Sequence, residues 1–294
     1  MKWNIICDSS CDTLEIKHLA EDTNFSIAPM KIIFGSKEFI DDENWNREEM
    51  LNTMTTYTGA SSTACPAPFD WAKEFEKRDY SIAITISGSL SGSYNSAVTA
   101  KDMVLEQYPE KKIHIVDSRS TSGTLILLAI CANTLIKQGA SFEQVVNELE
   151  RYNNSLQLTF CLKSYDNLVR TGRMNKIVGL AAAALGLRAV AMKTSEGKIS
   201  VMSKQRGDLN AYKYMVNQMA SLKDLKDRFI IISHVNNEEG AKKIKSLLVE
   251  NYGATRVAII PTRGLCSYYA DNGGILVAYY NLITHKKANR EVCH

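Results

Sequence analysis

Three segments of the chain follow the same plan: a short apolar run, a burst of small polar residues, and then a stretch with helical spacing of apolar residues. The apolar runs cover residues 3–7, 81–86 and 113–116, and the polar bursts cover 8–12, 87–93 and 117–123. Continuous rather than alternating apolar strands, each followed by a helix, are typical of a parallel sheet covered on both faces. In such a sheet the loops that follow the strands gather at one edge. The three polar bursts are therefore predicted to lie side by side.

The stretches around these units predict shorter elements. Two short strands are expected around Gly35, with helices over 14–20, 47–54, 69–78 and 125–136 and a loop over 61–68. The second half mixes strands and helices with more hairpins, which favours a mixed sheet. Its expected helices are 165–171, 177–187, 211–222 and 238–251, and its expected strands are 156–160, 189–192, 199–202, 228–232 and 256–260. The apolar stretch 273–281 is of unclear type.

A length of 294 residues corresponds to two domains of roughly 150 residues each. The polar segment 148–154 is the predicted boundary, which gives domains of residues 1–155 and 156–294. The expected fold class is α/β. The N-terminal domain is predicted to have three layers, α/β/α, around a parallel sheet, and the C-terminal domain to have two layers, α/β, with a mixed sheet.

The charge balance and the cysteines narrow the classes of partner. A formal net charge of +3 is too weak to indicate nucleic acid or an anionic membrane by its field alone. No apolar run reaches the ~18–20 residues of a spanning helix, and Asp8 interrupts any secretory signal. The seven cysteines are scattered, and the spacing of Cys7, Cys11 and Cys65 is not that of a zinc site. We expect unpaired thiols, a cytoplasmic location and no metal.

The polar burst 87–93 is the strongest local signal for a binding site. It lies where a strand turns into a helix, and the free N–H groups and the dipole of a helix start favour an oxyanion. Its serines add donors, and Gly88 and Gly92 let a ligand approach the backbone. The alternative is an ordinary helix capped by serine. Arg173 and Arg206, each beside a glycine, are candidates to pair with an anion or are solvated surface charges.

A catalytic role for Ser91 is the competing interpretation of this loop. The esterase elbow has the pattern G-x-S-x-G, whereas Ser91 is followed directly by Gly92. A nucleophilic serine also needs a base, and no histidine lies in the three polar bursts. The Walker and dinucleotide fingerprints are absent as well. A serine-dependent phosphotransferase or hydrolase is therefore the less favoured alternative.

The small-residue stretch 179–187 has two interpretations. Glycine and alanine at these positions are typical of closely packed helices. Their missing side chains also leave room for something long and apolar.

A series of motifs in a fixed order resembles the DegV family of bacterial fatty-acid-binding proteins over nearly the whole chain. The opening 8–12 is similar to D-S-T-A-D, 63–68 lies where T-S-Q-P-S-P is usual, and 87–97 is close to S-S-G-L-S-G-T-Y-Q-S-A. Shorter matches are 116–118 to I-D-S, 171–174 to G-G-R-I, and 204–207 to K-x-R-G.

The resemblance implies a two-domain α/β protein that buries a long-chain fatty acid and holds its carboxylate at the interdomain cleft. The residues implied for the carboxylate are Ser62, Thr63, Ser91, Gly92, Arg173, Arg206 and Tyr269. It also implies a carrier, not an enzyme: a separate ATP-dependent fatty acid kinase phosphorylates the bound acid, and the acyl phosphate enters phospholipid metabolism. The fatty acid is the ligand, and no cofactor, metal or nucleic acid is implied. Membrane insertion is not expected, although transient contact with a membrane fits this role.

The chain departs from the family pattern at two places. The late H-T-G-P-G is replaced by Tyr269-Ala270-Asp271-Asn272-Gly273, and the proline usual after N-I-K is missing at 186–189. A tyrosine hydroxyl still donates a hydrogen bond but does not titrate near neutrality. The loss of the histidine bears on partnership with a kinase more than on lipid binding. A third alternative is a regulatory protein, in which lipid is the signal for a protein partner.

Overall fold

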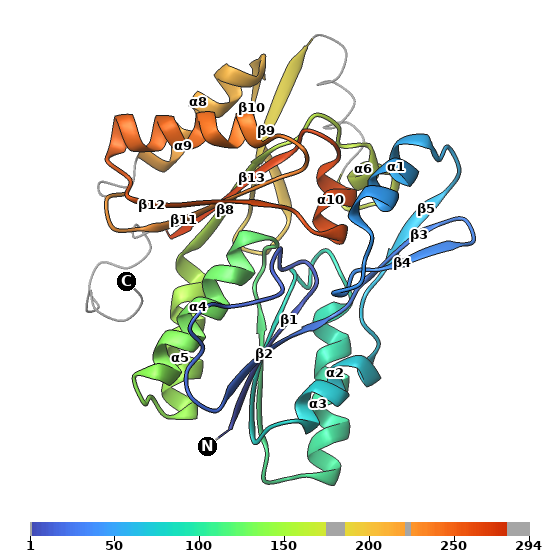
Figure 1. The fold of residues 1–294 in the computed structure, drawn as a ribbon, viewed down its shortest axis with the longest axis vertical. Helices are drawn as coiled ribbons and strands as arrows, with labels where there is room; N and C mark the ends of the chain where they lie inside the picture. The colour runs from blue at the N-terminus through green and yellow to red at the C-terminus, as the bar shows by residue number, and fades with distance from the viewer. Residues whose placement is uncertain (1, 175–185, 221–224, 281–294) are drawn as a thin grey trace.

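The computed structural model describes residues 2–174, 186–220 and 225–280, which form two lobes around separate sheets (Figure 1). The N-terminal lobe contains a four-stranded sheet in the order β2-β1-β6-β7, with all strands parallel. Its strands are β1 (Trp3–Asp8), β2 (Thr23–Ala28), β6 (Tyr80–Thr85) and β7 (Lys112–Asp117). The predicted parallel sheet is confirmed, and it also contains β2, which the sequence patterns did not predict.

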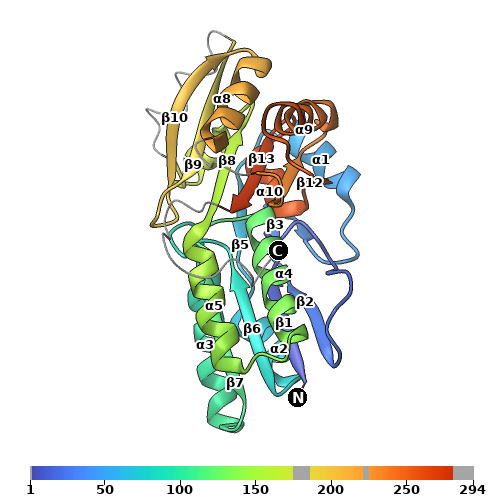
Figure 2. The ribbon, with the colours of Figure 1, turned by 90° about the vertical axis from the view of Figure 1, so that its left-hand side faces the viewer.

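Helices cover both faces of this sheet: one pair lies on each side of the strands in Figure 1, and one pair lies in front of them in Figure 2. One face carries α2 (Pro68–Glu76) and α3 (Ser93–Gln107), and the other carries α4 (Gly123–Lys137) and α5 (Phe142–Ser155). Successive side chains of a strand point to opposite faces. Ile5 accordingly packs in one buried cluster with Leu125, while Ile6 packs in another with Trp71. The predicted three-layer arrangement is confirmed.

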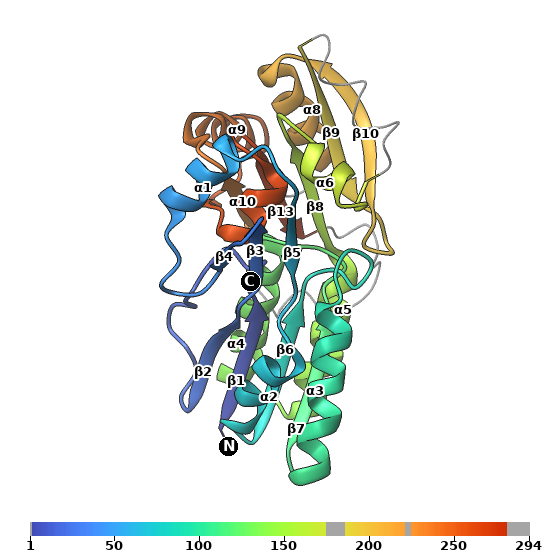
Figure 3. The same ribbon diagram turned by 90° about the vertical axis from the view of Figure 1, so that its right-hand side faces the viewer.

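A smaller antiparallel sheet extends from the N-terminal lobe to the side of the C-terminal lobe (Figure 3). Its strands are β3 (Lys31–Phe34), β4 (Lys37–Ile40) and β5 (Ser61–Ala64), with α1 (Arg47–Thr56) between β4 and β5. Both β3 and α1 contact α10 (Gly264–Ala270). The loop expected over 61–68 is wrong for its first four residues. Small polar side chains have little strand preference, and pairing with β3 imposes the extended conformation.

The C-terminal lobe contains a six-stranded mixed sheet in the order β10-β9-β8-β13-β11-β12. Neighbouring strands are antiparallel except β11 and β12, which are parallel. Its strands are β8 (Leu156–Cys161), β9 (Leu187–Lys193), β10 (Ile199–Arg206), β11 (Phe229–His234), β12 (Arg256–Pro261) and β13 (Ile275–Tyr280). The helices α8 (Asp208–Ala220) and α9 (Glu238–Tyr252) pack on one face, and the short α6 (Asp166–Arg170) follows β8. The predicted mixed sheet is confirmed.

Other local predictions met different outcomes. The apolar stretch of unclear type is β13, and the helix 177–187 falls almost wholly on residues outside the described ranges. The helix expected over 14–20 is wrong. There the side chain of Asn133 accepts a hydrogen bond from Ala20 N (2.8 Å) and donates one to His18 O (3.1 Å), so a tertiary contact replaces helical bonding. The end of α5 at Ser155 coincides with the predicted domain boundary, which stays a prediction.

The cysteines and the helix lengths complete the description. Free thiols are present at Cys7, Cys11, Cys65, Cys161 and Cys266. Cys131 takes part in a disulfide bond, so the expectation of unpaired thiols is wrong for this residue. Within the described ranges, no helix combines the length and the apolar character that crossing a membrane requires.

The start of α4 packs against the C-terminal sheet with no room for a side chain. A Cβ atom at Gly123 would lie 2.9 Å from Ile231 Cβ and 3.0 Å from Ala278 Cβ, on β11 and β13. Such distances force the backbone or the neighbours to move. Glycine at this position therefore sets how closely the two lobes approach.

We expect Gly123→Ala to lower the free energy of unfolding by about 1–3 kcal/mol, because the added methyl group overpacks the contact between the lobes. Glu106→Ala, at an exposed position of α3, is the control and should change it by less than about 0.5 kcal/mol. Denaturant unfolding measures both values. A Gly123→Ala protein as stable as the control would contradict the close approach.

Three charged side chains, Asp12, Asp41 and Arg263, join the lobes at the start of α10, and we call them the α10 clasp. Asp12 Oδ1 accepts a hydrogen bond from Arg263 N (2.7 Å), and Asp41 Oδ2 accepts one from Leu265 N (2.9 Å). The Arg263 guanidinium pairs with Asp41 Oδ1 at 3.0 Å. The clasp fixes α10 against the small sheet, where Tyr268 Oη lies 2.8 Å from Ser61 Oγ.

Asp12 titrates far from its usual range. Burial raises its pKa to about 7, against the hydrogen bonds from Ser122 and Arg263. The folded protein therefore keeps a proton on Asp12 at pH values where an unfolded chain, with a pKa of about 3.9, has lost it. The resulting stabilisation is complete below about pH 4 and is lost as the pH rises to about 7.

We expect Asp12→Asn to flatten the pH dependence of stability between about pH 4 and pH 7, where the proton on Asp12 contributes up to about 4 kcal/mol. The amide keeps an acceptor for Arg263 N but cannot titrate. Denaturant unfolding of both proteins across this range measures the two slopes. Asp8 is unchanged in the variant, so the difference between the slopes reports Asp12 together with its coupling to Asp41. Equal slopes would contradict the assignment.

Candidate functional site

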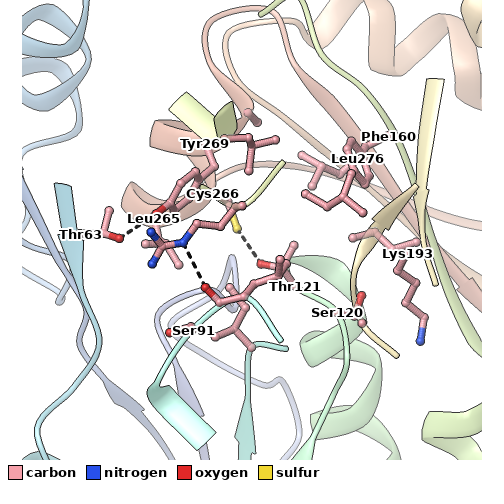
Figure 4. Close-up of a pocket in the computed structure, with 18 of the residues that line it drawn as sticks. Thr63, Ser91, Ser120, Thr121, Phe160, Lys193, Leu265, Cys266, Tyr269 and Leu276 are labelled. Atoms are coloured by element: carbon pink, nitrogen blue, oxygen red, sulfur yellow. Dashed lines mark hydrogen bonds between the residues drawn. The ribbon is translucent and has the colours of Figure 1, made fainter. Parts of the chain in front are cut away.

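A cavity of about 320 Å³ lies where the two lobes and the small sheet meet (Figure 4). The loops after β6 and β7 supply part of its wall, so two of the polar bursts do lie together there. The remaining wall comes from β5, α10 and the strands of the C-terminal sheet. This volume is within the roughly 300–1,000 Å³ of small-molecule pockets.

The C-terminal sheet gives the cavity an apolar wall. Leu158 and Phe160 of β8 and Leu276 of β13 face it, whereas the adjacent Cys161 and Val277 pack under α8 and α9. The period of two along each strand produces this division. Further apolar wall residues are Met30, Ile86, Leu90, Leu162, Leu168, Ile199 and Leu265. Such a wall favours an alkyl chain, because each buried methylene contributes about 0.8 kcal/mol.

Three hydroxyl groups mark one end of the cavity, and we call it the hydroxyl end. They belong to Thr63 of β5, Tyr269 of α10 and Ser91, just before α3. Thr63 Oγ1 and Tyr269 Oη form a hydrogen bond of 2.8 Å. Ser91 Oγ accepts a hydrogen bond from Ser93 N (3.3 Å), which leaves its own proton free to be donated. Gly92 is the N-cap of α3 and has no side chain that would occupy the N–H groups there.

A buried carboxylate behind this wall holds the serine loop in place. Asp8 Oδ2 accepts hydrogen bonds from Ile86 N (2.8 Å) and Ser93 Oγ (2.6 Å). Asp8 Oδ1 accepts two more from Ser10, one from its N–H (3.2 Å) and one from its hydroxyl (2.6 Å). Burial raises the pKa of Asp8, and the hydrogen bonds from Ser10 and Ser93 act against this rise. Asp8 thereby joins the first polar burst to the second.

Arg173 connects the C-terminal lobe to the same loop. It follows Gly172, whose φ of +76° lets the chain turn after α6. Its Nε donates to Leu90 O (3.2 Å) and its Nη1 donates to Thr171 O (2.7 Å). The guanidinium lies on the cavity wall and supplies positive charge beside the serine loop.

The turn between β9 and β10 closes the cavity against the N-terminal lobe. Ser87 Oγ donates to Gly197 O (2.8 Å), and Ser89 Oγ donates to Glu196 O (2.6 Å). Gly197 has a φ of +77°, and a Cβ there would lie 2.2 Å from Ser87 Oγ. Only glycine fits this contact between the turn and the serine loop.

Lys193 of β9 lies on the side of the cavity opposite Thr63, and we call this side the lysine end (Figure 4). Its side chain is buried with 8% of its surface exposed. Burial lowers the pKa of Lys193 to about 8; Arg119 acts in the same direction, and Asp117 acts against it. The Lys193 side chain thus contributes to the wall opposite the hydroxyls, while its amine points away from them (Figure 4).

The seven residues predicted for a carboxylate site fall into two groups. Thr63, Ser91, Gly92, Arg173 and Tyr269 line the cavity. Ser62 and Arg206 do not line it: Ser62 is exposed on β5 and Arg206 is exposed at the end of β10. Ser62 precedes one quoted motif and Arg206 lies within another. Alternation along β5 turns Ser62 away from the face of Thr63, whereas Arg206 lies at the end of β10 far from the β9–β10 turn, and of that strand only Ile199 is among the wall residues.

Several wall residues were not predicted from the sequence. Lys193, Thr121 and Cys266 carried no motif of their own. Thr121 could have been found, since it lies in the third polar burst, whereas Lys193 and Cys266 come to the wall through the packing of the lobes. Thr121 Oγ1 lies 3.4 Å from Cys266 Sγ (Figure 4).

Among the described residues, the surroundings of Ser91 do not provide a histidine base. No histidine is among the wall residues given by the described part of the chain, and His114 and His234 contact Glu150 and Asn237 instead. Among residues 2–174, 186–220 and 225–280, no group of three or more His, Cys, Asp or Glu side chains is placed to hold a metal ion. The geometry fits the binding of an amphiphile with an oxygen-rich head better than covalent chemistry at Ser91.

Comparison with known proteins identifies close relatives of the whole chain. Residues 2–281 match the family model described as an uncharacterised protein of the DegV family. A DegV domain-containing protein of Streptococcus gordonii is 38% identical, covering 95% of this chain and 99% of the relative.

Solved structures are similar over the same length. The Fatty Acid Kinase (Fak) B3 protein of Streptococcus pneumoniae, loaded with linoleic acid, is 35% identical with a TM-score of 0.92, covering 95% of this chain and 99% of that one. A DegV family protein of Eubacterium eligens, loaded with heptadecanoic acid, is 31% identical with a TM-score of 0.90 and the same coverage. The chain described here therefore belongs to the DegV family.

Proposed function

We propose that this protein binds a long-chain fatty acid, with the carboxylate at the hydroxyl end and the acyl chain along the apolar wall of the C-terminal sheet. The observation that carries the proposal is the cavity itself: one continuous pocket joins the hydroxyls of Thr63, Ser91 and Tyr269 to a wall of leucine, isoleucine and phenylalanine. The family supports it, since two similar structures carry linoleic and heptadecanoic acid.

The physical balance favours such a ligand. An acyl chain of about 16 carbons offers on the order of 10 kcal/mol from burial, before the costs of binding are subtracted. The carboxylate of the fatty acid then needs enough hydrogen-bond donors to replace the water molecules that it loses on binding. A buried carboxylate without such donors would cancel the free energy gained by burying the acyl chain. The hydroxyls of Ser91 and Thr63, the free N–H groups at the start of α3 and the nearby Arg173 guanidinium can provide them.

Ser62 and Arg206 are proposed to lie outside the head site. Neither lines the cavity, so neither side chain supports a direct contact with the carboxylate.

Tyr269 takes the place of the histidine that the family motif leads one to expect. Its hydroxyl is already paired with Thr63 at 2.8 Å.

We further propose that the protein is the binding partner of a separate fatty acid kinase, located in the cytoplasm where ATP is available. The similarity to the Fak B3 protein supports this role. The absence of a base beside Ser91, among the described wall residues, fits a protein that presents its ligand and leaves the chemistry to the kinase.

Ser91→Ala and Thr63→Val should each weaken binding of linoleic acid about tenfold, because each removes a hydrogen bond to a charged group. Ser62→Ala is the matched control, since Ser62 precedes Thr63 but is exposed outside the cavity. Titration with linoleic acid and mass spectrometry of lipid released on denaturation measure the effect. Wild-type retention in both site variants would remove the hydroxyl end from the proposal.

A mixture of this protein, linoleic acid, ATP and a fatty acid kinase should form acyl phosphate faster than the same mixture without the protein. The protein with ATP alone should form none, because its own residues only hold the acid. Ser91→Ala should lower the rate through weaker loading and recover at saturating fatty acid. Acyl phosphate formed by the protein alone, or an acyl or phosphoryl adduct on Ser91, would favour the enzyme alternative.

A further inference from the structure

Two further hydroxyl groups lie on the cavity wall beyond the hydroxyl end, and we call them the acceptor pair. They belong to Ser120 and Thr121, in the loop between β7 and α4. In Figure 4 both oxygens face the cavity, between Ser91 on one side and Phe160 on the other. An alkyl chain that runs from the hydroxyl end to the apolar wall therefore passes two polar atoms that the proposed carboxylate site does not use.

The proton of each hydroxyl in the acceptor pair is already committed to the protein. Ser120 Oγ donates to Thr124 Oγ1 (2.8 Å). Cys266 donates its single thiol proton to Ser10 O (3.3 Å). In the contact of 3.4 Å between Thr121 Oγ1 and Cys266 Sγ, the hydroxyl is therefore the donor. Within the described part of the chain nothing donates to either hydroxyl oxygen, so the acceptor pair presents lone pairs and no protons to the cavity.

Backbone hydrogen bonds hold this loop in position without a ligand. Ser120 O accepts hydrogen bonds from Ser87 N (2.8 Å) and Ser118 Oγ (3.1 Å), and Ser120 N donates to Ser118 Oγ (3.1 Å). Thr121 O accepts a hydrogen bond from Thr124 N (3.3 Å), where α4 begins. Groups that are fixed before binding lose little freedom when a ligand arrives, so a donor that meets them gains most of the hydrogen bond.

A plain alkyl chain leaves the lone pairs of the acceptor pair without a donor. Methylene groups cannot donate, and covering oxygen atoms with them removes the water that would otherwise hydrogen-bond there, which costs free energy. A hydroxyl group on the chain supplies the missing donor. A keto group does not, because its oxygen only accepts and would face other oxygen lone pairs. The acceptor pair therefore distinguishes chains that differ only in the oxidation state of one carbon.

We propose that the acceptor pair is a hydrogen-bonding subsite for a hydroxyl group carried on the acyl chain, and that the ligands of this cavity include hydroxylated long-chain fatty acids. The inference deepens the proposed function and rests on it, because the carboxylate must lie at the hydroxyl end for the chain to run past Thr121. Since the distance between the two sites is fixed, the subsite also selects one position of the hydroxyl along the chain.

The test uses octadecanoic acids that carry a hydroxyl group, a keto group or no substituent, with the substituent at successive carbons. Wild-type protein should prefer the hydroxy acid to the keto acid, most strongly at one position. There, Thr121→Val, which replaces the hydroxyl by a methyl group, should lower the ratio of hydroxy to keto affinity about tenfold. Thr121→Ser keeps the hydroxyl and should retain most of the preference. Calorimetric titration measures the dissociation constants.

Thr99→Val is the matched control for the same chemical change outside the cavity. Thr99 is exposed on α3, where its hydroxyl donates to Asn95 O (3.0 Å). This variant should keep the wild-type ratio of hydroxy to keto affinity. A control that changes the ratio as much as Thr121→Val would overturn the assignment of the subsite to Thr121.

The outcomes separate this inference from the proposed function. An unchanged ratio in Thr121→Val overturns the subsite, and so does a preference that is the same at every position of the hydroxyl. An equal loss of hydroxy, keto and unsubstituted acids in Thr121→Val also overturns it, because Thr121 would then only shape the wall. Wild-type protein that binds the unsubstituted acid but shows no preference for a hydroxyl refutes the subsite alone. Protein that binds none of the acids refutes both proposals.

Discussion

The buried carboxylate of Asp8 is the interaction on which the ligand site depends. It ends β1 and accepts hydrogen bonds from the chain after β6 and from the first helical residue of α3, so that one anion fixes both loops. A charge so deeply buried is tolerable only because four donors surround it. The same bonds aim Ser91 and Gly92 toward the cavity. Because Asp8 holds both loops, the binding groups of Ser91 and Gly92 are already in position before a ligand arrives.

The pattern of apolar residues along the sequence predicted much of the fold, because this pattern follows which strands are buried in the sheets. Strands β1 and β6 are mostly apolar and buried along nearly their whole length, as burial on both faces requires, whereas the edge strand β7 alternates between buried and more exposed residues. The failures occur where distant parts decide. The apolar residues in 14–20 have helical spacing, but the side chain of Asn133 of α4 forms hydrogen bonds with backbone groups of this segment. Ser61–Ala64 has no strand pattern, yet β3 supplies its partners. Neither contact can be inferred from neighbours in the sequence.

The candidate site was likewise predictable where short motifs carry its residues and unpredictable where distant parts of the chain bring them together. Thr63, Ser91, Gly92, Arg173 and Tyr269 lie within motifs that were recognisable before the structure, and all of them line the cavity. Motif membership does not say whether a side chain reaches the cavity: Ser62 and Arg206 lie in or beside the same motifs and outside the wall. Lys193 belongs to no motif. A lysine in a strand is ordinarily a solvent-exposed charge, and only the packing of the β9–β10 turn on the serine loop buries it.

The β9–β10 turn holds to the serine loop through main-chain oxygens, and this has an evolutionary consequence. The carbonyl groups of Glu196 and Gly197 accept the hydrogen bonds, so the identity of the Glu196 side chain is irrelevant to closure, whereas Gly197 admits no replacement. The outer surface of the turn can therefore drift in charge and shape among homologues without opening the cavity. The side chains of this turn can differ among homologues while its main-chain contact with the serine loop is kept.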